Sequence, residues 1–130
     1  ELTIGYGDLT AAALSETVDV GVPLPTGASP LVCRNKLITP FAHATASTAT
    51  LKVGNDNDVD AYDAGGDIFT GSAFTGLDWY RGSPASGIGA PAYDGTSTGQ
   101  VQATITIDAG TVDSFTAGSV RTQLWGYVLP

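Results

Sequence analysis

The sequence predicts an all-β protein, specifically an antiparallel β-sandwich that is jelly-roll-like. First, short stretches of alternating apolar and polar residues recur along the chain, as expected for strands with one buried face. Second, clusters of Gly, Pro, Asn and Asp separate them, and the chain holds 17 glycines and 7 prolines. Third, no stretch has the periodicity of a long amphipathic helix. With 130 residues, the chain is expected to form one domain over 1–130.

The first half of the chain contains four predicted strands. The clearest alternation is in "TVDVGV", where every second residue is valine, and Pro23 and Pro25 end that strand because proline cannot donate to a sheet ladder. Pro40 is expected to end the third strand in the same way. Residues 8–16 are too short for a helix that is stable alone, so we predict a loop or single turn. The four strands are expected at residues 2–6, 17–22, 31–38 and 47–53.

The second half begins with a short predicted strand over 67–70 and ends with the two clearest strands, over 100–107 and 119–129. Residues 71–99 are irregular and rich in glycine, and a connection of this length in a compact domain is typical of a contact surface. In the last strand, Thr122 and Leu124 share one face, whereas Arg121, Gln123 and Trp125 share the other.

The charge balance is strongly acidic, with a net charge of −8. The cations are dispersed along the sequence, so nothing predicts a row of phosphate contacts, and a nucleic-acid partner is not expected. An anionic membrane surface is disfavoured for the same reason, and no apolar run reaches the ~20 residues that span a bilayer. The five cations are Arg34, Lys36, Lys52, Arg81 and Arg121.

An acidic stretch, "NDNDVDAYDAGGD", follows the fourth predicted strand. Asp56, Asp58 and Asp60 occupy the first, third and fifth positions of a calcium loop, and Asp67 occupies the twelfth. The sixth position is Ala61 where such loops need Gly, the twelfth is shorter than the usual Glu, and the flanks are not helical. We therefore favour a solvated connection between strands, with a calcium site on these aspartates as the alternative.

No catalytic set is apparent, and we predict that the protein is not an enzyme. His43 is the only histidine and Cys33 the only cysteine, so neither a multi-histidine metal site nor an intrachain disulfide can form. A G-x-S-x-G elbow and a phosphate-binding glycine loop are both absent. We expect a hydrogen-bonded or surface histidine, a buried thiol and no cofactor.

Aromatic residues carry the remaining signal, because Trp, Tyr and Arg are enriched at protein–protein contacts. One predicted contact region surrounds Trp79 in the irregular segment. The second is an N-terminal arm, residues 1–9, which could donate an edge strand to a neighbour. Exposed aromatics on a sheet could instead stack on sugar rings. The predicted interface residues are Leu2, Ile4, Tyr6, Trp79, Tyr80, Arg81, Trp125 and Tyr127.

Four segments together resemble virion proteins of tailed bacteriophages: "DLTAAALSETVDVGVPLPTGA", "LITPFAHATASTATLKVGNDND", "DIFTG" and "TAGSVRTQLWGYVLP". The resemblance covers most of the chain and is to head decoration, or cement, proteins. It implies a β-sandwich or jelly-roll subunit, a homotrimer, and the major capsid protein as partner. It also implies assembly in the host cytoplasm and a place on the outer capsid surface, where the subunit bridges neighbouring capsomers. Tail or fibre proteins share this composition, so a tail or fibre component, or a carbohydrate-binding module, is the alternative. The strand "SPLVCRNK" departs from the pattern through Arg34 and Lys36.

Overall fold

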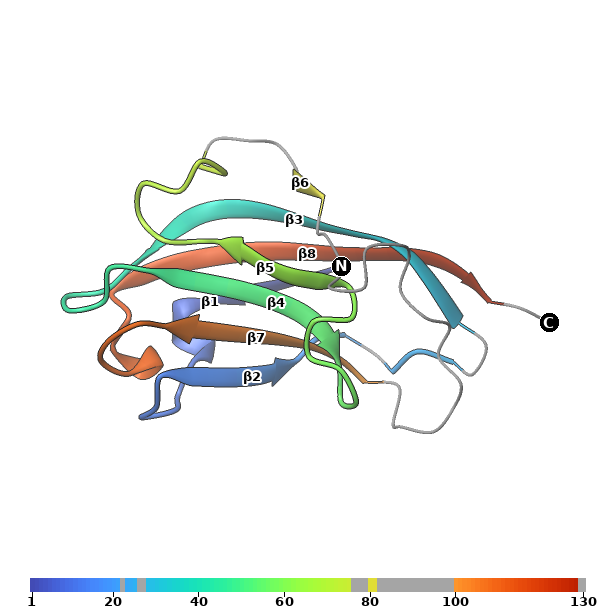
Figure 1. Ribbon diagram of the computed structural model, residues 1–130, viewed down its shortest axis with the longest axis horizontal. Coiled ribbons are helices and arrows are strands. Elements are labelled where there is room, and N and C mark those ends of the chain that lie inside the picture. The colour runs from blue at the N-terminus through green and yellow to red at the C-terminus, as the bar shows by residue number, and fades with distance from the viewer. Residues whose placement is uncertain (22, 26–27, 76–79, 82–99, 129–130) are drawn as a thin grey trace.

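The computed structural model is a sandwich of two antiparallel sheets, which confirms the predicted fold class (Figure 1). It describes residues 1–21, 23–25, 28–75, 80–81 and 100–128. No helix in these ranges is both long enough and apolar enough to cross a membrane. The elements are β1 (Leu2–Gly5), η1 (Tyr6–Asp8), β2 (Ser15–Asp19), β3 (Ala28–Ala42), β4 (Ala49–Asn55), β5 (Asp63–Asp67), β6 (Tyr80–Arg81), β7 (Val101–Ile107), η2 (Val112–Ser114) and β8 (Ala117–Val128).

The strand order is that of a jelly roll. Sheet A has the order β1-β8-β3-β6 and sheet B the order β2-β7-β4-β5. The first four strands therefore pair with the last four in reverse sequence, β1 with β8, β2 with β7, β3 with β6 and β4 with β5. Rolling up this long hairpin brings β8 beside β3 and β7 beside β4. Two Greek keys in two sheets define this architecture.

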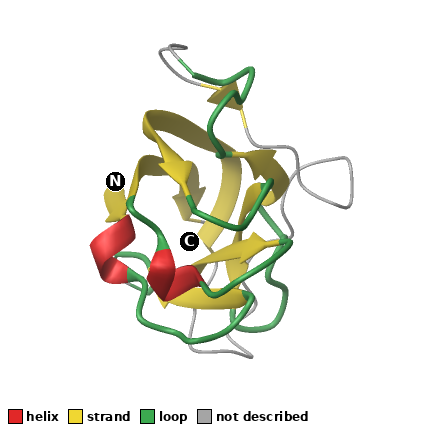
Figure 2. Ribbon diagram, turned by 90° about the vertical axis from the view of Figure 1, so that its left-hand side faces the viewer, coloured by secondary structure: helices red, strands yellow, loops and turns green. Residues whose placement is uncertain are grey.

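The core forms between the sheets because alternate residues of each strand point inward. In β7, Ala103 and Ile105 are fully buried, whereas Thr106 between Ile105 and Ile107 is exposed. Phe41 of β3 is also fully buried and meets the edge of the Phe115 ring, with 5.1 Å between ring centroids. The two 3-10 turns, η1 and η2, lie at the same end of the sandwich, which faces the viewer in Figure 2.

The predicted end of the third strand at Pro40 is wrong, because β3 continues from Ala28 to Ala42 and contains both Pro30 and Pro40. Its pairing with β8 shifts register between Pro30 and Val32, and again on either side of Thr39. Such irregularities leave backbone groups outside the regular ladder, so a proline costs no ladder hydrogen bond there. The strand therefore runs on through residues that usually terminate one.

The predicted strand over residues 67–70 is displaced. The paired strand is β5, Asp63–Asp67, which lies inside the acidic stretch. After it, Phe69 makes only an isolated parallel bridge with Phe41, while Ile68 is fully buried. The two glycines before Asp67 hid the strand from propensity arguments, because glycine is depleted in strands.

Candidate functional site: the outer face of sheet A

The outer face of sheet A carries a group of charged, amide and aromatic side chains supplied by β3 and β8. In β3 the inward residues Cys33, Asn35 and Leu37 are buried and alternate with Arg34, Lys36 and Ile38. In β8 the buried residues Val120 and Thr122 alternate with Arg121, Gln123 and Trp125. We call the outward set, Arg34, Lys36, Ile38, Arg121, Gln123 and Trp125, the basic face.

Strand pairing brings together cations that are far apart in the sequence. Lys36 lies opposite Arg121 in the β3–β8 register, and Arg34 lies opposite Gln123. On the other side of β3, Arg34 is also the register partner of Arg81 in β6. Four of the five cations of the chain therefore belong to strands of sheet A. Cations that are dispersed along the sequence are therefore brought onto neighbouring strands, which sequence spacing alone does not reveal.

A polar network links the basic face to the N-terminal residues. The Trp125 indole Nε1 donates a hydrogen bond to Gln123 Oε1 at 3.3 Å, and Gln123 Nε2 donates to the Glu1 carboxylate. The other oxygen of that carboxylate lies 3.4 Å from Arg121 Nε, which also lies 3.4 Å from Thr3 Oγ1. These side chains are substantially exposed, so each contact adds little to stability. They do hold the polar groups of the face in one arrangement.

Trp125 and Ile38 lie at opposite ends of the basic face. Trp125 is 59% exposed and Ile38 is 44% exposed, although both are large apolar side chains. A shallow hollow of about 280 Å³ lies beside Trp125 and is also lined by Glu1, Gln123 and Leu124. Exposed apolar groups at the two ends of a charged band are features of a contact surface.

A second hollow, of about 190 Å³, opens beside the ends of β2 and β7. Its lining is mainly aliphatic and includes Leu2, Val20, Leu24 and Leu124. The buried hydroxyl of Thr122 also lines it, but this hydroxyl donates to Asn35 inside the core. The polar groups that would orient a ligand therefore do not converge here as they do in typical small-molecule sites.

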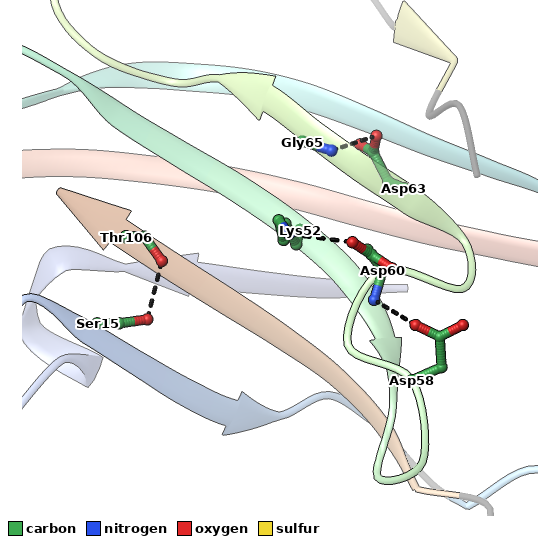
Figure 3. Close-up of polar contacts among 7 residues, drawn as sticks. All are labelled: Ser15, Lys52, Asp58, Asp60, Asp63, Gly65 and Thr106. Carbon is green, nitrogen blue, oxygen red and sulfur yellow. Dashed lines mark hydrogen bonds and ion pairs between the residues drawn. The ribbon is translucent and has the colours of Figure 1, made fainter. Parts of the chain in front are cut away.

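The loop between β4 and β5 carries Asp56, Asp58 and Asp60, the candidate calcium ligands, and Figure 3 shows Asp58 and Asp60. Asp60 forms an ion pair with Lys52 at 3.0 Å, and the hydrogen-bonded ammonium lowers the pKa of this carboxyl below its ordinary range. Asp58 accepts a hydrogen bond from the Asp60 backbone N–H at 3.3 Å. Among the described residues, no cluster of three or more Asp, Glu, His or Cys side chains is arranged to hold a metal ion. Asp56 and Asp58 are exposed, as expected for a solvated loop.

The acidic stretch differs from the expected solvated connection at Asp63, which is 3% exposed. Its carboxylate accepts a hydrogen bond from Asn35 Nδ2 at 2.6 Å, and Asn35 Oδ1 accepts one from Thr122 Oγ1 at 2.8 Å. The chain Thr122–Asn35–Asp63 thus crosses the core from sheet A to sheet B. Burial, followed by the nearby Asp63 charge, raises the pKa of the neighbouring Cys33 thiol to about 12. These buried polar groups hold the two sheets together, and the thiol is not activated as a nucleophile.

His43 has a structural position at the end of the sandwich. Its Nδ1 accepts backbone N–H groups of Thr45 and Ala46 at 3.1 and 3.0 Å, so Nε2 carries the proton and donates to the Thr111 carbonyl at 3.1 Å. The ring also meets the edge of Phe115, with 5.5 Å between centroids. Both ring nitrogens are therefore used to join the loop after β3 to the loop before β8.

The N-terminal arm predicted as a donated edge strand is part of the chain's own sheet A. Residues Leu2 to Gly5 pair with β8 along their whole length. Ile4 is 1% exposed and belongs to the core, so its side chain is not accessible to a partner in this arrangement. Leu2 is half-buried and packs against the core, whereas Tyr6 is 47% exposed. A strand with a buried apolar residue is expected to stay in its own fold.

The other predicted contact residues have different outcomes. Trp79 lies outside the described residues. Tyr80 forms β6 together with Arg81 and pairs with Asn35 of β3, and Tyr127 pairs with Ser29 at the far end of β8. Trp125, whose side chain the structure describes, lies on an open sheet surface. Sequence reasoning missed Arg34 and Lys36 as its neighbours. The alternation in "CRNKLI" indicates that Arg34 and Lys36 face outward, but it does not identify the strand that lies beside them.

Comparisons with family models, with curated proteins and with solved structures find no match to this chain.

Proposed function

We propose that this protein is a non-enzymatic virion structural protein that decorates a phage capsid and stabilises it by bridging neighbouring capsomers. The observation that carries the proposal is an open sheet face that holds Trp125, 59% exposed, together with Arg34, Arg121 and Gln123. Trp and Arg are the residues that dominate the energy of protein contacts. The phage-like segments of the sequence supply the setting, with the major capsid protein as partner on the outer surface.

A jelly roll suits this role because it holds the contact residues rigidly before binding. Its two sheets hold the contact residues on paired strands rather than on loops, so little conformational entropy is lost when they bind. Capsid and lectin domains both use this architecture, which is an argument by analogy of fold only. Homotrimers would present three such faces at once, so that moderate contacts add up to tight binding through avidity.

Purified protein added to undecorated phage heads tests the proposal. We expect saturable binding and a higher temperature of head disruption. Trp125→Ala should weaken that binding about tenfold or more, the effect of removing a contact hot spot. Val59→Ala is the matched control, because Val59 is also exposed, at 44%, but lies in the acidic loop away from sheet A. Absence of binding by the wild-type protein would refute the capsid role.

A second candidate function is saccharide binding, as in a fibre component or a carbohydrate-binding module. The specific observation is the hollow of about 280 Å³ beside the exposed indole of Trp125, where Glu1 and Gln123 supply hydrogen-bonding groups. A glycan array distinguishes the two functions. A saccharide signal that Trp125→Ala abolishes favours this candidate, and silence of the wild-type protein across the array removes it.

A further inference from the structure

The basic face contains a row in which residues of like charge lie opposite each other. Lys36 lies opposite Arg121 in the β3–β8 register, and Arg34, two residues before Lys36 on the same face of β3, is exposed. Like charges directly opposite on adjacent strands are destabilising relative to neutral pairs. Breaches of such local rules concentrate at functional sites. This row, next to the exposed Arg34, therefore makes the face a candidate docking surface for an anionic partner.

The charge of the molecule is divided between its two sheets. On sheet B, Asp19 and Asp67 are exposed, and the loop between β4 and β5 adds Asp56 and Asp58. Lys52, the cation of sheet B, is engaged by Asp60. Among the described residues of this protein of net charge −8, the outer face of sheet A is therefore the side that attracts anionic partners, and the long-range field orients it toward them.

The apolar ends of the basic face indicate which class of anionic partner it fits. Trp125 lies opposite Val32, before the basic residues of the face, and Ile38 lies after them. From Val32 to Ile38 is six residue steps along β3, or ~20 Å. A protein surface supplies both carboxylates for the centre and apolar groups for the two ends. The phosphate backbone of a nucleic acid offers no apolar group for Ile38, and Ile38 offers no flat ring on which a sugar could stack.

The Glu1 side chain shows how a carboxylate sits on this face. One of its oxygens lies 3.4 Å from Arg121 Nε, and the other accepts from the Gln123 amide. Arg34, opposite Gln123 on β3, is exposed and lies on the side of that amide away from β1. A carboxylate from outside could therefore be accommodated beside Arg34, as the Glu1 carboxylate is beside Arg121.

We propose that the basic face docks on an acidic protein surface, with partner carboxylates against Arg34 and Arg121 and apolar contacts at Trp125 and Ile38. This inference deepens the proposed function by naming the chemistry of the docking face, and it rests on that function in taking the partner to be a protein. Binding through this face is expected to be strongly dependent on salt, because it is governed by exposed charges.

Immobilised poly-L-glutamate, a model acidic polypeptide, provides a direct test with the full chain. We expect binding at low ionic strength that weakens about tenfold at physiological salt. Arg34→Gln and Arg121→Gln should each weaken it at least about threefold, whereas Lys52→Gln, the same charge change on sheet B, should change it by less than about twofold. Glu1→Gln should strengthen binding by releasing Arg121. Thermal melting checks that each variant is folded.

The opposing outcomes are equally specific. Failure of the wild-type chain to bind poly-L-glutamate, or an equal loss for Lys52→Gln and Arg34→Gln, overturns the inference. Tighter binding to heparin or duplex DNA assigns the face to another class of polyanion, and salt-sensitive self-association assigns it to a second copy of the chain. Heads that bind Arg34→Gln and wild type equally would leave the capsid role standing without this face. Charge-dependent binding to poly-L-glutamate without binding to heads would leave the acidic docking face standing without the capsid role.

Discussion

Asn35 of sheet A donates a 2.6 Å hydrogen bond to the buried carboxylate of Asp63 in sheet B. The same amide accepts from Thr122, so its oxygen and nitrogen are both used inside the core. Buried polar groups are costly when unpaired and specific when paired, which makes this contact a determinant of how the two sheets face each other.

Replacing Asn35 with Ala is expected to lower the free energy of unfolding by about 2–4 kcal/mol, because it removes the amide that donates to the buried Asp63 carboxylate and accepts from Thr122. Urea denaturation measures this directly. Thr17→Ala is a suitable control, since the Thr17 hydroxyl bonds to Thr104 on the exposed outer side of sheet B. A loss below about 1 kcal/mol for Asn35→Ala would contradict the importance assigned to the cross-sheet contact.

The buried Cys33 thiol is expected to make the stability of the protein depend on pH in the alkaline range. Its pKa is raised from 9.0 to about 12 in the folded protein, so the folded state favours the neutral thiol. This contribution is fully present below pH 9 and is lost as pH rises toward 12, because only the unfolded chain ionises in that window. Stability measured from pH 8 upward should therefore decline more steeply for wild type than for Cys33→Ala. Parallel declines would show that the thiol is not protected.

Asp108 is expected to make the stability of the protein depend on pH in the acid range. Its carboxylate accepts the Ser47 hydroxyl and the backbone N–H groups of Ser47 and Thr48, which together lower its pKa well below the ordinary 3.8. The resulting stabilisation is present above pH 3.8 and is lost as the pH falls below that value. The melting temperature of Asp108→Ala should be lower than that of wild type at neutral pH, and the difference should shrink on acidification. A difference independent of pH would contradict this role.

Gly118 occupies a position that other residues cannot take. Its φ is +147°, and a Cβ there would lie 2.3 Å from Phe41 Cδ1 in the core. Gly118→Ala should therefore destabilise the protein by about 3 kcal/mol, combining backbone strain with overpacking. Gly7→Ala is the matched control, because a Cβ at Gly7 meets nothing within 4 Å. Similar melting temperatures for the two variants would refute the close approach.

The order of the amino acids is sufficient to predict the fold class and most of the inside–outside pattern. Alternation in residues 100–107 and 119–129 predicts β7 and β8, because period-two burial is a local property of a strand. Local reasoning failed where a neighbouring strand decides the outcome. Pro40 lies within β3 because the ladder is irregular on either side of Thr39. The Asp63 carboxylate is buried where Asn35, on another strand, donates a hydrogen bond to it.

The candidate site could not be predicted from the order of the amino acids, because it depends on which strands become neighbours. Arg34 and Lys36 are more than 80 positions from Arg121 in the sequence, and β8 becomes the neighbour of β3 when the long hairpin rolls up. Charge clustering depends on distances in space, whereas a sequence records separation along the chain. The alternation of one strand indicates which residues face outward, but strand order and register determine which of them share a surface.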